Sequence, residues 1–166
     1  MFDKLGGLPA HPLLVHIPVV LIPLAAIGAL AIAVRPKWMR SFGWLVAAVA
    51  GVGFAGAMFA AQSGEAYKET LEASGQTITN TLEDHAEMGD AARAFAAVFF
   101  ALVVVWVLFA WWRRKAGEEK VTATVKQPKL IGILLSVLVV IGGVAATASV
   151  TVTGHSGAKT VWESKK

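Results

Sequence analysis

The sequence contains no cysteine among its 166 residues. This absence excludes covalently attached c-type haem, cysteine-ligated iron–sulfur clusters, thiolate zinc sites and disulfides within the chain. Any transition metal or haem iron must therefore be held by other side chains, of which imidazole is the commonest ligand. Histidine is itself scarce, with four in the whole chain, so the positions of these four decide what site is possible.

Charge is also scarce. Charged residues make up 16% of the chain, whereas hydrophobic residues make up 56% and the mean hydropathy is +0.63. A membrane-spanning helix needs about 20 largely apolar residues, and four such runs lie near residues 12–34, 42–62, 91–112 and 130–153. Because backbone polar groups in lipid must find partners within their own segment, these runs predict an all-α fold. We expect one membrane domain over residues 1–166, an integral membrane four-helix bundle.

The few charges are unevenly distributed along the chain. The loops after the first and third runs are basic, whereas the connection at 65–90 is mostly acidic. The positive-inside rule therefore predicts basic loops in the cytoplasm, with both termini and the 65–90 connection extracytoplasmic. This pattern is typical of a multi-pass protein of the cytoplasmic (inner) membrane of a bacterium, surrounded by the lipid bilayer. It argues against nucleic acid as a partner, despite a pI near 9.6.

Two of the histidines flank the start of the first run. Pro12 is expected to occupy the first helical position, which leaves His11 just outside the helix and His16 about one turn inside it. A five-residue gap separates the two by about 140° around a regular helix. His11 must therefore fold back if both are to reach one site. Pro18 and Pro23 remove backbone N–H groups and predict a bent or loosened helix.

The remaining sequence signals are small residues, which affect helix packing, and capping residues, which mark helix ends. Residues 51–56 formally match G-x-G-x-x-G, but within an apolar helix we interpret these small residues as a packing surface rather than a dinucleotide site. Residues 66–73 are expected to form a short interfacial helix. Asn80 followed by Glu83 resembles a capping box and predicts a helix that continues into the third run. Gly154 is expected to end the fourth helix.

The predicted topology brings all four histidines to the outer side of the membrane. His11 and His16 lie at the outer end of the first run, His85 before the third and His155 after the fourth, with Glu65 at the outer end of the second. Ionisable residues at membrane depth are candidates for function. The alternative is that these histidines are interfacial residues that hydrogen-bond backbone or lipid headgroups.

The residues around the histidines also carry a family resemblance over nearly the whole chain. The segments are His11–Pro18, Ser63–Ala66, Asp84–Glu87 and Gly154–Gly157. They resemble the bacterial membrane family called domain of unknown function 2231. The resemblance implies a four-helix membrane protein and, because some members are joined to Rieske-type or cytochrome-like domains, redox work at the outer face with a membrane or extracytoplasmic redox partner.

A cofactor-binding redox module is the first of three function classes. One form is a b-type haem held by two facing imidazoles, for which His16 and His155 are the preferred pair and His85 the alternative, with Arg93 near the propionates. The other is a copper, iron or zinc site that gathers three or four histidines with Glu65 as an oxygen ligand. The sequence leaves haem b and a transition metal ion as open alternatives.

Two further classes need no cofactor. The chain could be a non-catalytic subunit or assembly factor of a larger membrane complex, with its small-residue faces packed against partners. A transporter needs polar groups in the middle of the spans, and these runs offer few. No nucleophile elbow or catalytic triad is present, so the sequence assigns no reaction. Nor does it fix an oligomeric state.

Overall fold

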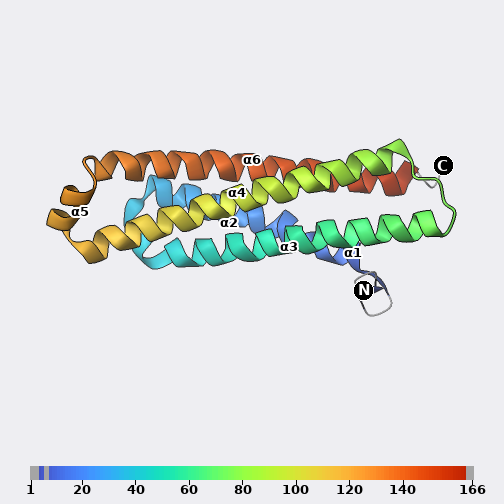
Figure 1. Cartoon of the computed structure of the whole chain (residues 1–166), viewed down its shortest axis with the longest axis horizontal. Helices are drawn as coiled ribbons and strands as arrows, with labels where there is room; N and C mark the ends of the chain where they lie inside the picture. Colours follow the sequence, from blue (N-terminus) through green and yellow to red (C-terminus); the bar gives the residue numbers. More distant parts are fainter. Residues whose placement is uncertain (1–3, 6–7, 164–166) are drawn as a thin grey trace.

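Four long helices form an elongated bundle in the computed structural model, which describes residues 4–5 and 8–163 and the side chains of 11–159 except 118 (Figure 1). The long helices are α2 (His16–Val34), α3 (Met39–Ala73), α4 (Asn80–Ala116) and α6 (Pro128–Glu163). The short elements are β1 (Lys4–Leu5), β2 (Leu8–Pro9), α1 (Ala10–Leu14), η1 (Pro36–Trp38) and α5 (Glu118–Thr124). All four long helices are apolar and long enough to cross a membrane, so the predicted all-α membrane bundle is confirmed.

The helices pack in a closed ring in which each touches two neighbours. Helix α2 packs against α3 and α6, and α4 packs against α3 and α6. Both termini and the α3–α4 connection lie at one end of the bundle, here called the histidine end (Figure 1). The opposite, basic end carries η1 and α5. The basic loops and the acidic connection therefore lie at opposite ends of the bundle, as the charge pattern predicts. Which side of the membrane each end faces stays a prediction.

Small residues bring the helices close together in the interior. A Cβ on Gly53 would lie 3.0 Å from Ile22 of α2, and one on Gly51 would lie 3.0 Å from Phe100 of α4. Gly56 packs directly onto Ile17. The interpretation of residues 51–56 as a packing surface is thus confirmed, because these positions admit neighbouring side chains that a larger residue would exclude.

Large apolar side chains point outward along all four helices, as expected for a surface in contact with lipid. The outward residues include Val20, Leu24, Ile27, Leu45, Val52, Phe59, Val98, Val105, Ile133, Ile141 and Val144. In water such a belt would favour aggregation, whereas hydrocarbon solvates it at no cost.

Helix boundaries differ from the sequence prediction in several places. The first helix starts at Ala10 rather than Pro12, so His11 lies in its first turn, where backbone N–H groups need no helical partner. Val15 then interrupts the helix between α1 and α2. The predicted loosening is met here, where Pro18 has no N–H to donate to the carbonyl of Leu14, although Val15 keeps helical dihedrals. It is not met at Pro23, which α2 contains without a break.

The outer connection is shorter than predicted. Helix α3 continues without a break to Ala73, so residues 66–73 extend a spanning helix rather than form a separate one. Helix α4 begins at Asn80 as predicted, but Thr79 is its N-cap, with its hydroxyl accepting from the Leu82 N–H. Gly154 does not end α6, which continues to Glu163. Beyond Gly154, Ser156 and Gly157 of α6 still contact His85 of α4.

A candidate two-histidine site

His11 is held against α3 by two polar groups. Its Nδ1 lies 2.9 Å from the Ala60 carbonyl oxygen and 3.3 Å from Ser63 Oγ. Ser63 is 1% exposed, and its hydroxyl donates to the same carbonyl at 2.8 Å. Because a carbonyl oxygen can only accept, Nδ1 of His11 carries the proton. In the neutral ring, Nε2 then has a free lone pair.

His85 is held against α6 by an equivalent arrangement. Its Nδ1 lies 2.8 Å from Ser156 Oγ, and that hydroxyl donates to the Thr153 carbonyl at 2.9 Å. The Ser156 hydroxyl therefore links the His85 ring to the Thr153 carbonyl. The Thr153 hydroxyl also reaches the Met88 carbonyl at 3.0 Å and ties α6 to α4.

The two imidazoles meet across the histidine end of the bundle. Their ring centroids are 6.0 Å apart, and the ring planes are nearly perpendicular at 84°. A metal–imidazole bond is about 2 Å long, so two imidazoles on opposite sides of one ion would have their centroids roughly 6 Å apart. Orientation of Nδ1 by a protein oxygen is the usual support for a ligating histidine. The centroid separation of the pair thus matches that of a two-histidine ligand set.

Two glycines make room for these rings. A Cβ on Gly64 would lie 3.2 Å from His11 Cε1, and a Cβ on Gly157 would lie 2.8 Å from His85 Cε1. Each glycine directly follows the serine that binds the ring, so the dipeptides Ser63-Gly64 and Ser156-Gly157 serve the two histidines in the same way. Sequence reasoning missed these four residues as site components. The repeated Ser-Gly at the outer ends of two spans was the signal that could have found them.

The other predicted site residues lie elsewhere. His16 is exposed, and its Nδ1 donates to the Pro12 carbonyl within its own helix turn at 2.6 Å. His155 and Glu65 are exposed as well. Arg93 forms a surface ion pair with Asp90 at 2.9 Å.

The preferred pair of His16 and His155 is therefore not the pair that meets. Among the side chains that the structure describes, no three His, Asp or Glu residues are placed to hold one metal ion. The expected cluster of three or four histidines with Glu65 is not assembled. The cause is rotational phase, since about 140° separates His11 from His16, and only the former faces α3.

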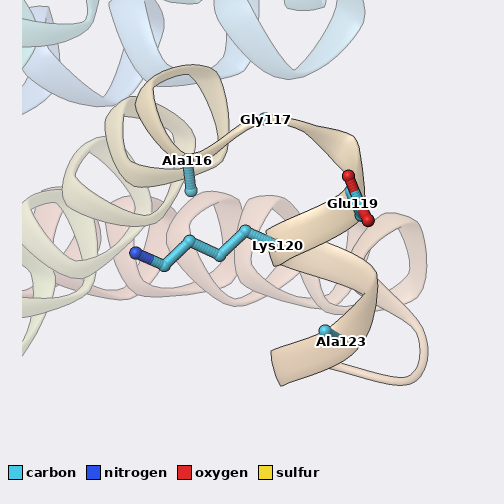
Figure 2. Close-up of a pocket in the computed structure, with 5 residues that line it drawn as sticks. All are labelled: Ala116, Gly117, Glu119, Lys120 and Ala123. Atoms are coloured by element: carbon cyan, nitrogen blue, oxygen red, sulfur yellow. The ribbon is translucent and has the colours of Figure 1, made fainter.

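Two hollows lie at the basic end, far along the bundle from these histidines. One, of about 550 Å³, lies under the α4–α5 turn and is lined by Ala116, Gly117, Glu119, Lys120 and Ala123. Figure 2 shows the Lys120 side chain running back beneath Ala116. A larger hollow adjoins α4 and α6. No histidine lines either hollow, so neither enlarges the two-histidine site.

Comparison with known proteins places the chain in a family but gives no activity. Residues 7–165 match the family described as "Predicted membrane protein (DUF2231)". No curated protein and no solved structure matches the chain. The family match covers both histidines of the pair and both Ser-Gly dipeptides.

Proposed function

The chain belongs to the membrane-protein family described as domain of unknown function 2231, and we propose that it binds a transition metal ion through His11 and His85 at one end of its bundle. The observation that carries the proposal is the 6.0 Å separation of the two ring centroids, with both Nδ1 atoms engaged by protein oxygens. Imidazole suits copper, iron and zinc alike. With copper or iron the site would transfer electrons, and water or a partner's side chain would complete the coordination.

A metal ion fits the residues present better than haem b does. Near the pair, Ala60 and Ser63 of α3 are buried, and so is Ala92, two turns along α4 from His85. A planar macrocycle would have to displace these packed residues, whereas a single ion needs only the space between two imidazoles. If haem did bind, His11 and His85 would hold it, and Arg93 is the residue that the sequence predicts near a propionate.

The experiment measures copper, iron and zinc in protein purified from its native membrane, together with its absorption spectrum. His11→Ala and His85→Ala should each reduce affinity for the retained ion by more than about 100-fold, because loss of an orienting partner alone costs about 10–100-fold. His16→Ala and His155→Ala are the matched controls. These should retain the ion, since neither ring contacts the pair in the part of the chain that the structure describes.

Each other outcome has a distinct meaning. A Soret band in wild type that disappears in His11→Ala and His85→Ala would mean that the two histidines hold haem b rather than a single metal ion. Loss of the ion in His16→Ala or His155→Ala, with the paired histidines dispensable, would refute the ligand assignment. A folded protein with neither metal nor chromophore, recovered with a stable membrane partner, would favour the non-catalytic subunit instead.

A further inference from the structure

An open cavity of about 950 Å³ lies at the basic end, between the α2–α3 turn, α4, α5 and α6. Its size falls in the range of small-molecule sites, about 300–1,000 Å³. Buried apolar side chains form part of its wall, among them Ile32, Trp106 and Val121. The cationic residues that line it are Lys37, Arg40, Arg113, Arg114 and Lys129. The cavity therefore combines an apolar wall with clustered positive charge.

The positive charge of the cavity is not paired with a carboxylate in the part of the chain that the structure describes. Among the described side chains, none of the five cavity-lining cations forms an ion pair with a carboxylate. Arg113 of α4 reaches toward α6 across the cavity. Its guanidinium is 5.8 Å from the Phe109 ring centroid, and its Nη1 would lie 3.4 Å from a Cβ on Gly132 of α6. The Arg113 guanidinium therefore lies in van der Waals range of α6 at Gly132.

The cavity also opens toward the lipid-facing surface. Ile133 of α6 lines it and is 59% exposed, as part of the outward apolar belt. A ligand with a charged head and an apolar tail could therefore place its head in the cavity and its tail along α6. A free inorganic anion would neutralise the cations but leave the apolar wall uncovered, and a zwitterionic headgroup would bring its own cation against five others.

We propose that this cavity binds the headgroup of an anionic diacyl phospholipid, with an acyl chain lying against the apolar surface beside Ile133. Basic pockets between membrane helices on the cytoplasmic side are suited to such headgroups. The site is separate from the histidine pair, at the other end of the bundle (Figure 1).

Two nearby cations provide matched controls because they lie outside the cavity. The Lys115 ammonium is 5.2 Å from the Trp111 ring, and the Arg35 guanidinium is 5.3 Å from the Trp38 ring. Neither residue lines the cavity. Both share the basic end with the lining residues, so they report what general surface charge contributes. If a headgroup binds in the cavity, neutralising Arg113 should weaken lipid retention more than neutralising Lys115 does.

The experiment uses the full chain in nanodiscs of phosphatidylcholine with increasing phosphatidylglycerol, and native mass spectrometry to count the lipids it retains. Wild type should retain phosphatidylglycerol in preference to phosphatidylcholine. Arg113→Gln and Arg40→Gln should each weaken that retention about fivefold, the effect expected for one cation near a phosphate. Lys115→Gln and Arg35→Gln should leave it unchanged, and Arg113→Lys should restore most of it.

Three results would overturn the proposal. Equal weakening in Lys115→Gln and Arg113→Gln would mean general surface charge rather than a site. Equal retention of phosphatidylcholine would mean that the phosphate charge is not recognised. Displacement of phosphatidylglycerol by millimolar inorganic phosphate would mean a free-anion site without lipid specificity. If Arg113→Gln does not insert into the membrane, comparing phosphatidylglycerol retention in Arg40→Gln with that in Lys115→Gln answers the same question.

Discussion

Gly157→Ala should disrupt the two-histidine site without disrupting the helix that carries it. Alanine favours a helix by about 1 kcal/mol over glycine, so α6 itself gains. The added Cβ, however, would lie 2.8 Å from His85 Cε1, and ordinary contact begins at 3.4 Å. The ring must therefore move away by about 0.6 Å, the difference between these two distances.

That displacement is large compared with what the site tolerates. The His85 Nδ1–Ser156 Oγ hydrogen bond, 2.8 Å long, would approach 3.4 Å if the ring moved along it, beyond the usual limit of about 3.2 Å. Metal–ligand distances tolerate only about 0.2 Å. We expect the affinity for the metal ion to fall about 10–100-fold, as when an orienting partner of a ligand is lost.

The assay is a metal titration of the purified chain in nanodiscs, with helicity checked by circular dichroism. Gly154→Ala, one turn earlier on α6, is the matched control, since its Cβ would lie 3.7 Å from Val19 Cγ2 in ordinary contact. It should bind the ion like wild type. Equal affinity in Gly157→Ala and Gly154→Ala, with both proteins helical, would show that the position of the His85 ring does not matter to metal binding and would refute the reasoning.

Two further predictions concern topology and packing. A C-terminal alkaline phosphatase fusion should be active and a cytoplasmic reporter at the same position silent, because the basic loops favour the cytoplasmic side; the opposite pattern would place the histidine end in the cytoplasm. Gly56→Leu should lower the stability of the bundle by about 1–3 kcal/mol, measured by unfolding in mixed micelles, since its Cβ would already lie 2.8 Å from Ile17 Cβ and 3.1 Å from Pro18 Cδ. Gly89→Leu, with nothing within 4 Å of its Cβ, should cost far less.

Much of the fold was determined by the sequence alone. Four apolar runs of bilayer length leave an α-helical bundle as the only way to pair every backbone group in lipid. The small residues at 51–56 could be assigned to packing because they lie inside an apolar helix, whereas a dinucleotide-binding motif lies between a strand and a helix. The interruption at Val15 follows from the missing N–H of Pro18. These are local properties, which depend on composition and on spacing within one segment.

Helix ends and the choice of histidines were decided only by the tertiary structure. Gly154 predicts the end of the fourth helix, but α6 continues past it, where Ser156 and Gly157 contact His85 of α4. The predicted topology places all four histidines at one end of the bundle. Helix periodicity, however, predicts the relative direction of two side chains only when both belong to the same helix. Which rings meet depends on how each helix is rotated against its neighbours. In the folded bundle this rotation brings the rings of His11 and His85 together while His16 and His155 remain exposed.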